Sequence, residues 1–239
     1  MLDILGSISL TALTILFFGT LVLAGAGNGA WRRRLAGIGA TWMATIVALA
    51  GLGLFSRTGR LGIFVLSAVV FAPIIAGGIA LARSRRVQAF ASSIPLAVLV
   101  GVHVGRLLGA FFLALDQAGR LPPTFARSAG YGDVFIGLTA LPLAWAIHRR
   151  VSGWWVMALA WNALGALDLT SALTLGVGSA ASPLRFIFET PDSGAVGVLP
   201  WALIPGILVP LFMLTHVVVF TRLAARARGH ERMTLPHAA

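Results

Sequence analysis

The sequence contains neither cysteine nor lysine, and only seven of its 239 residues are acidic. Without cysteine there are no disulfides, thiolate nucleophiles, iron–sulfur clusters or C-x-x-C-H haem attachments. Without lysine there is no retinal Schiff base, which excludes a rhodopsin-type photoreceptor. No H-E-x-x-H motif or nucleophile–base pair can be recognised. Whether the protein is an enzyme stays open, and the sequence favours a non-catalytic protein.

Charged residues are scarce in general, at 10% of the chain, while 58% of residues are hydrophobic. The mean hydropathy of +0.93 is far above that of soluble domains. A chain of this length holds about seven spans of roughly 20 residues joined by short loops. We therefore predict an all-α, polytopic integral membrane bundle of seven transmembrane helices over residues 1–222, followed by a basic cytoplasmic tail over residues 223–239.

Apolar runs between charged residues and Gly/Pro-rich turns place the seven spans. We expect the first to be an anchor rather than a cleaved signal peptide, because Asp3 precedes it and three arginines follow it. The predicted spans are Ile4–Gly25, Leu35–Phe55, Leu61–Ala82, Ala91–Asp116, Asp133–Ile147, Trp154–Val177 and Val198–Phe220.

All 18 basic residues are arginine, and they are unevenly divided between the two sides of the predicted bundle. The positive-inside rule then predicts an outer N-terminus and an inner C-terminus in the inner (plasma) membrane. Anionic lipids are the expected partners of the basic face, whereas nucleic acid is not, because no soluble basic module is present. The richer side holds Arg32, Arg33, Arg34, Arg83, Arg85, Arg86, Arg149, Arg150, Arg222, Arg226, Arg228 and Arg232, and the other holds Arg57, Arg60, Arg120, Arg127 and Arg185.

Arg106 and Asp168 are the two charged residues predicted to lie well inside the hydrocarbon. A rise of about 1.5 Å per residue places them roughly 22 Å and 21 Å from the cytoplasmic boundary. Because they share a level and a buried charge needs a partner, we predict that they pair. The pair is either a latch between two helices or part of a ligand site. The first three spans hold no ionisable residue in their interiors.

The helix of Arg106 has two distinctive faces. One is a stripe at three/four spacing, and the other is a small-residue ridge that permits close approach of a neighbouring helix. The stripe consists of His103, Arg106, Ala110, Leu113 and Gln117, and the ridge of Gly101, Gly105 and Gly109.

The helix of Asp168 carries Trp161 on the same face and Asn162 about 100° away. A buried amide needs partners, so we expect Asn162 to bond another helix. His103 and His216 are predicted to lie about 15 Å apart in depth, which argues against a shared haem or metal. No metal site and no cofactor is assigned.

Two segments on the outer side are expected to cover a cavity. The Pro/Gly-rich run Ala118–Tyr131 is predicted to be a non-helical loop, with Asp133 as an N-cap or first-turn carboxylate of the next helix. The second segment is Gly178–Gly197. Phe125 or Tyr131 would close the cavity over a small anionic or carbonyl-bearing ligand held by Arg106.

Four short motifs carry a resemblance to an uncharacterised group of bacterial polytopic, about seven-helix, integral membrane proteins. The resemblance extends over about residues 90–215 and implies no substrate, cofactor or catalytic residue. The motifs are Arg106-x-x-Gly109, Leu121-Pro122-x-x-Phe125, Gly130-x-Gly132-Asp133 and Trp161-Asn162-x-x-Gly165-x-x-Asp168-Leu169.

Three classes of function remain open. The few ionisable groups favour a non-catalytic helical subunit of, or binding protein for, a larger membrane assembly. A small-solute transporter or receptor with an outward-facing pocket is the first alternative, and a membrane enzyme acting on a lipid or isoprenoid is the second. The candidate ligand-binding residues are Arg106, Asp168, His103, Asn162, Trp161, Phe125, Tyr131 and Asp133.

Overall fold

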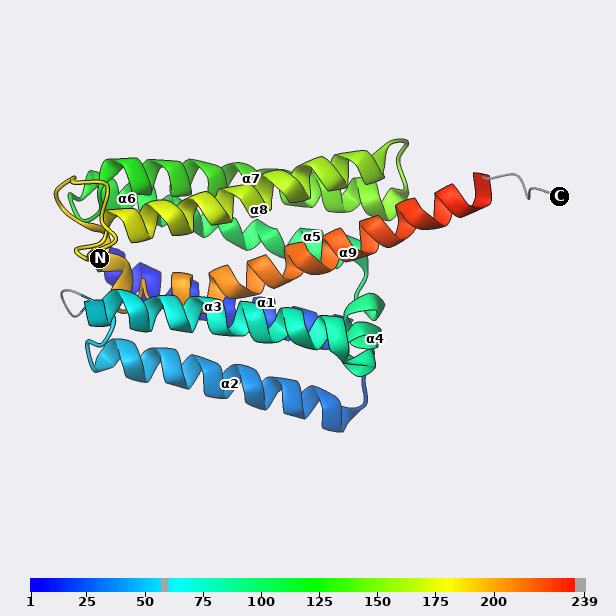
Figure 1. The fold of residues 1–239 in the computed structure, drawn as a ribbon, viewed down its shortest axis with the longest axis horizontal. Coiled ribbons are helices and arrows are strands. Elements are labelled where there is room, and N and C mark those ends of the chain that lie inside the picture. Colours follow the sequence, from blue (N-terminus) through cyan, green and yellow to red (C-terminus); the bar gives the residue numbers. More distant parts are fainter. Residues whose placement is uncertain (57–59, 235–239) are drawn as a thin grey trace.

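The computed structural model describes residues 1–56 and 60–234, with side chains for all of these except residues 60 and 228–234. The described chain is all helical (Figure 1). Of the arginines assigned to the two faces, Arg57 lies outside the described residues, as does the end of the predicted tail from residue 235. The elements are α1 (Leu2–Ala24), α2 (Gly29–Gly51), α3 (Arg60–Arg83), α4 (Arg85–Ser93), α5 (Leu96–Gly101), η1 (Val102–Gly109), α6 (Ala110–Gln117), α7 (Pro123–Arg149), α8 (Trp154–Ser179), η2 (Ser193–Gly197), η3 (Ile204–Leu208) and α9 (Val209–Thr234).

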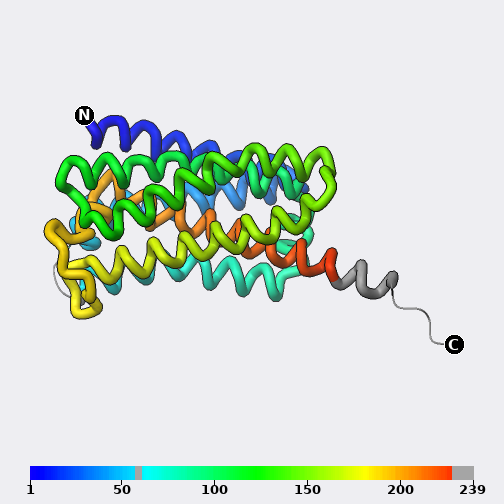
Figure 2. Tube along the Cα trace, turned by 90° about the horizontal axis from the view of Figure 1, so that it is seen from above, coloured from blue at the N-terminus to red at the C-terminus, as the bar shows by residue number. Residues whose placement is uncertain are grey.

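Seven segments of this described chain are long and apolar enough to cross a membrane, which confirms the predicted all-α bundle of seven spans. The long helices lie side by side in a bundle (Figures 1 and 2). One end of the bundle holds α4 and the C-terminal part of α9, and the other holds the N-terminus and the long 180–203 segment. The arginine clusters 32–34, 83–86 and 149–150 gather at the end marked by α4, which we call the arginine end. We call the opposite end the long-loop end.

Two predicted helix starts at the long-loop end were wrong, in addition to that of the second span, which begins at Gly29 rather than at Leu35. The segment Ala118–Tyr131 is not a loop, because α7 already begins at Pro123. Proline has no N–H to lose at the first helical position and its fixed φ favours a helix start there. The last span begins at Ile204 rather than at Val198, and its first turns form the π-helix η3. Both shifts change the depth of the side chains that follow.

The fourth span is interrupted twice. Ile94 and Pro95 separate α4 from α5, since proline disfavours a helical conformation of the residue before it. From Val102 to Gly109 the helix winds as the 3₁₀-helix η1, an unusually long run for this conformation. Arg222 of α9 donates a hydrogen bond to the carbonyl of Ile94 at the first break. The predicted span Ala91–Asp116 therefore comprises the end of α4, then α5, the 3₁₀-helix η1 and most of α6.

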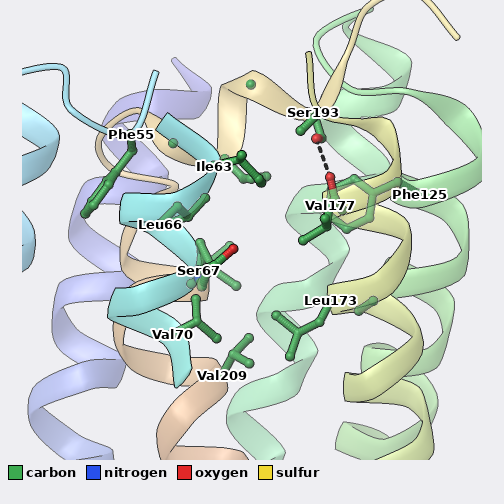
Figure 3. Close-up of a pocket in the computed structure, with 18 of the residues that line it drawn as sticks. Phe55, Ile63, Leu66, Ser67, Val70, Phe125, Leu173, Val177, Ser193 and Val209 are labelled. Atoms are coloured by element: carbon green, nitrogen blue, oxygen red, sulfur yellow. Dashed lines mark hydrogen bonds between the residues drawn. The ribbon is translucent and has the colours of Figure 1, made fainter. Parts of the chain in front are cut away.

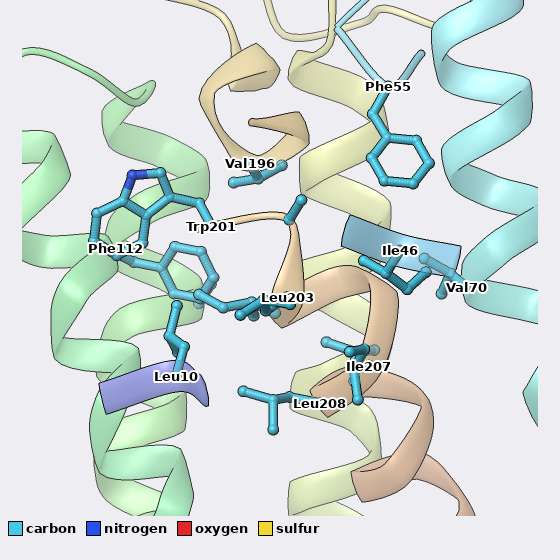
Figure 4. Close-up of a cluster of buried hydrophobic side chains, with 14 of the residues drawn as sticks. Leu10, Ile46, Phe55, Val70, Phe112, Val196, Trp201, Leu203, Ile207 and Leu208 are labelled. Atoms are coloured by element: carbon cyan, nitrogen blue, oxygen red, sulfur yellow. The ribbon is translucent and has the colours of Figure 1, made fainter. Parts of the chain in front are cut away.

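A large apolar cluster joins α1, α2 and α3 to the rest of the bundle (Figure 4). Trp201 lies at its edge with no exposed surface, and its Nε1 donates to Asp3 Oδ1 at 2.8 Å. Arg120 Nη1 also donates to Asp3 Oδ1, at 2.9 Å. On the other side, Trp42 Nε1 of α2 donates to the Gly206 carbonyl in η3 at 2.9 Å. The bonds of Trp201 and Gly206 thus connect η3 and the residues before it to α1 and α2.

Close packing around η1 depends on glycine. A Cβ at Gly137 of α7 would lie 2.7 Å from the Leu107 backbone nitrogen, so the backbones of α7 and η1 approach each other directly. The predicted ridge is used in close approach, but its members face different neighbours. Gly105 faces Leu13 of α1, while Gly109 faces Asp133 of α7. The glycines thus allow two helices to approach one turn of η1 from different directions.

Candidate functional site: a buried charge cluster beside an apolar cavity

Three helices meet at the guanidinium of Arg106, whose side chain has no exposed surface. Its Nε donates to Asp133 Oδ1 of α7 at 2.6 Å, and its Nη2 donates to Asp168 Oδ2 of α8. Its Nη1 donates to the Gly165 carbonyl at 3.1 Å. The structure thus contains the predicted Arg106–Asp168 pair and adds a second carboxylate. We call Arg106, Asp133 and Asp168 the charge cluster.

The prediction that Asp133 caps the start of a helix was wrong. Because α7 begins at Pro123, Asp133 lies well inside the helix and is neither an N-cap nor a first-turn residue. Its carboxylate is turned toward η1, where it accepts from Arg106. A charge buried in hydrocarbon costs several kcal/mol unless it is paired. Arg106 is paired with carboxylates of both α7 and α8, whereas the sequence predicted a pair with Asp168 alone.

Glycines make the space that the charge cluster occupies. A Cβ at Gly132 would lie 1.7 Å from Asp168 Oδ1, and one at Gly109 would lie 2.2 Å from the Asp133 Cβ. At Gly165 the added carbon would lie 2.5 Å from the His216 Cε1. Side chains so close cannot coexist, so each of the three helices contributes one position where no side chain fits.

The 3₁₀ winding of η1 aligns the residues of its polar face. With three residues per turn, side chains three apart stand directly above one another. His103, Arg106 and Gly109 therefore share one line along η1. In an α-helix these residues would fan out over one face. The imidazole, the guanidinium and the approach of α7 are brought into register by the local winding.

Two histidines, His103 of η1 and His216 of α9, pack against each other below Arg106. Their ring centroids are 4.3 Å apart, and Trp161 stands edge-on to His103 at 5.2 Å. The predicted difference in depth between these histidines was wrong. It rested on a last span beginning at Val198, whereas the span begins at Ile204 and places His216 near its middle. Among the described residues, no group of three His, Asp, Glu or Cys is arranged to hold a metal ion.

The hydrogen bonds of the two imidazoles assign their tautomers. Thr215 Oγ1 donates to the Phe212 carbonyl at 2.7 Å, so it accepts from His103 Nε2 at 2.9 Å. Asn162 Nδ2 donates to the His216 carbonyl at 3.1 Å, so its Oδ1 accepts from His216 Nδ1 at 2.7 Å. These bonds place a proton on His103 Nε2 and on His216 Nδ1. The other ring nitrogens, His103 Nδ1 and His216 Nε2, are buried and have no hydrogen-bond partner among the described residues.

A cavity of about 170 Å³ lies between α3 and α8 toward the long-loop end (Figure 3). Its walls are largely apolar, with Leu66 and Val70 on one side and Leu173 and Val177 on the other. Ser193 closes part of the long-loop end, where its hydroxyl donates to the Gly176 carbonyl at 2.6 Å. A cavity of this volume is sized for a small organic molecule such as benzene rather than for an ion alone.

Asp133 connects this cavity to the charge cluster. It lines the large cavity and also a second one of about 20 Å³ that lies against Arg106. The smaller space is sufficient for one water molecule. Both cavities share a further part of their walls, formed by Phe112, Leu169, Ile204 and Val209. The Asp133 carboxylate therefore lies between the buried guanidinium of Arg106 and the large cavity.

Most of the predicted site residues come together. Arg106 and Asp168 are in the charge cluster with Asp133, and His103, Asn162 and Trp161 form the adjoining polar layer, in which Trp161 Nε1 donates to Thr139 Oγ1 at 2.9 Å. Phe125 is 4% exposed and lines the large cavity. Tyr131 is 65% exposed on the outer face of α7 and lines neither cavity.

Sequence reasoning missed His216 and Thr215 as members of this layer. The available indication was a run of prolines at Pro200, Pro205 and Pro210, which marks an irregular entry to the last span. A start at Ile204 would have brought the predicted depth of His216 about 9 Å closer to that of His103.

A protein-family model described as "Domain of unknown function (DUF8737)" matches residues 63–224. The matched region contains the whole charge cluster and both histidines of the polar layer. No curated protein and no solved structure matches the chain.

Proposed function

The chain belongs to the DUF8737 family, and from its site we propose that it binds and carries a small, largely apolar solute within the membrane. The solute bears a positively charged or hydrogen-bond-donating group, which is held by Asp133. The observation that carries the proposal is the cavity of about 170 Å³ that reaches this carboxylate. The proposal follows the transporter or receptor alternative rather than the subunit.

The chemistry of the cavity wall supports this class of solute. Its lining includes two carboxylates, Asp133 and Asp192, and no arginine or histidine among the described residues. An anion at Arg106 is less well supported than expected, because Nε, Nη1 and Nη2 all donate to protein atoms. A cation or donor finds an acceptor in Asp133, whereas its apolar part replaces the hydrocarbon around Leu173 and Val70.

The orientation that we propose for the protein in the membrane rests on its distribution of arginines. We place the arginine end on the cytoplasmic side of the inner (plasma) membrane, where anionic lipids would surround it, in line with the positive-inside rule. The long-loop end, and the cavity near it, then face outward. Phe125 lies in the cavity wall and would control release of the solute.

Two probe molecules of the same shape test the proposal: phenyltrimethylammonium, a fixed cation, and its neutral isostere tert-butylbenzene. Calorimetric titration of the purified protein in detergent should show binding of both, with the cation favoured. Leu173→Trp fills the cavity and should abolish binding. Leu167→Trp is the matched control on α8, since Leu167 is 66% exposed. Equal binding to the two variants would refute a solute site in this cavity.

A helical subunit is the second candidate, favoured by the packing of α2. Only Ile46 and Ala50 of this helix are buried. A partner membrane helix would cover its outward face at Ala44. Because the chain has no cysteine, Ala44→Cys gives a single reactive thiol, and cross-linking in native membranes to a protein of defined mass would support the subunit. Recovery of uncross-linked monomer alone would argue against it.

A further inference from the structure

We infer that the charge cluster holds one exchangeable proton, and that a cationic solute binding at Asp133 displaces it. The protein would thus exchange a small organic cation for a proton. This inference rests on the proposed function, because it concerns the same cavity. It adds the charge of the solute and the ion to which its movement is coupled.

The first argument is the balance of charge. The titratable groups that face one another here are Arg106 and His103 on η1, Asp133 on α7, Asp168 on α8 and His216 on α9. The small cavity beside Arg106 is also lined by α1 and η3, and their lining residues, Leu10, Ile204 and Leu208, are apolar. With both carboxylates ionised, the set carries one net negative charge, and one added proton makes it neutral.

The second argument is burial. An uncompensated charge in hydrocarbon costs several kcal/mol, so the neutral, singly protonated set is the state favoured without a ligand. The two imidazoles are poor sites for the missing positive charge, because a second proton on either ring would lie on a buried nitrogen that has no acceptor among the described residues. A protonated imidazole would also stand next to the Arg106 cation. The proton therefore belongs to the carboxylates.

Asp133 is the carboxylate placed for exchange. Its Oδ1 accepts from Arg106, whereas its Oδ2 has no hydrogen bond to any described residue. The same side chain lines the chamber that the solute would enter and the small cavity that fits one water. A proton leaving Asp133 toward the chamber therefore needs no rearrangement of the bonds that hold Arg106.

The exchange step balances in atoms and charge. The carboxylic acid of Asp133 loses its proton to water, and the carboxylate that remains pairs with the cationic group of the solute. The net charge of the buried set, counted with its ligand, stays at zero before and after. A neutral solute of the same shape leaves the proton in place. Proton release thus distinguishes the two probes.

Proton release is measured with a pH indicator in weakly buffered detergent solution while the full chain is titrated with each probe. Phenyltrimethylammonium is a quaternary ammonium with no dissociable proton, so release of about one proton per bound cation must come from the protein. tert-Butylbenzene should release none. Raising the pH should strengthen binding of the cation and leave that of the neutral probe unchanged. This comparison needs no variant.

Variants then locate the exchange. Asp133→Asn should keep binding the neutral probe, release no proton, and weaken cation binding by at least about tenfold, or 1.4 kcal/mol. Asp116→Asn is the control, because Asp116 lines neither cavity and pairs with Arg127 instead, and it should keep proton release. If the Asp133→Asn variant does not fold, Asp133→Glu, which keeps the carboxylate but changes its position, is titrated with the same two probes instead.

The outcomes separate the two proposals. Binding of the cation that depends on Leu173 but proceeds without proton release, at any pH, overturns the exchange and leaves the solute site standing. Loss of cavity-dependent binding for both probes overturns the solute site itself. Proton release that persists in Asp133→Asn overturns the assignment of the exchange to this carboxylate.

Discussion

Helices α1–α3 and helices α5–α9 differ in the kind of contacts that hold them together. The first group is held by apolar contacts and by bonds at its ends, such as that between Asp3 and Trp201. The second group encloses a cation, two carboxylates and two imidazoles in its interior. In hydrocarbon, apolar faces gain little from contact with each other, so polar bonds and small residues specify which helices pack. The second group is therefore the part whose arrangement depends on individual residues.

The strongest test of this difference compares one ion pair from each group. Arg106→Leu leaves two buried carboxylates without their cation, and we expect a loss of about 3–5 kcal/mol in the free energy of unfolding. Asp3→Asn breaks the pair with Arg120, whose side chains are 36% and 54% exposed, and should cost at most about 1 kcal/mol. Thermal unfolding in detergent measures both, and similar losses would remove the distinction between the two groups.

Glycine substitutions make the same comparison by volume. Gly132→Ala introduces a carbon where Asp168 lies, and overpacking of this kind typically costs about 1–3 kcal/mol. Gly19→Ala on α1 meets no atom within 4 Å and should leave stability unchanged or slightly higher, since alanine is the better helix former. Thermal melting decides between these expectations. A stable Gly132→Ala variant would show that α7 and α8 can separate at the charge cluster.

Side-chain hydrogen bonds give a smaller contrast. Asn162→Leu removes both bonds to His216 and should cost about 1 kcal/mol, the usual scale for bonds between membrane helices. Thr45→Val on α2 loses only a bond to the Thr41 carbonyl of its own helix and should have no measurable effect. Chemical denaturation in mixed micelles resolves differences of this size. An effect of Thr45→Val equal to that of Asn162→Leu would contradict the reasoning.

The smallest perturbation tests the orientation of the whole bundle. Single cysteines at Ser128 and Ala181, both exposed near the long-loop end, should react with a membrane-impermeant thiol reagent from outside. Cysteines at Gln88 and Ser152, exposed at the arginine end, should react only after permeabilisation. Ser193 is unsuitable because it is 2% exposed. A reversed pattern would place the large cavity on the cytoplasmic side.

The number of spans and the pairing of Arg106 with Asp168 could both be predicted from the sequence. Hydropathy fixes the spans, and a shared depth was enough to connect two charges on different helices. The partnership of Asp133 could not, because the Pro/Gly-rich segment before it predicts a loop, whereas Pro123 begins a helix. The stacking of His103 on His216 was missed for a related reason: depth estimates inherit any error in a helix start. The cavity depends on side chains from several helices and has no linear pattern.

The 3₁₀-helix η1 has a consequence for the span that contains it. Each residue there turns about 120° and rises about 2.0 Å, against about 100° and 1.5 Å in an α-helix. Over eight residues, the segment gains about 4 Å in length and about 160° in rotation. The helix α6 therefore presents to the core a face opposite to the one that an uninterrupted helix would present. The span therefore consists of two α-helical segments, α5 and α6, that are rotated relative to each other about the helix axis, and the length of η1 determines that rotation.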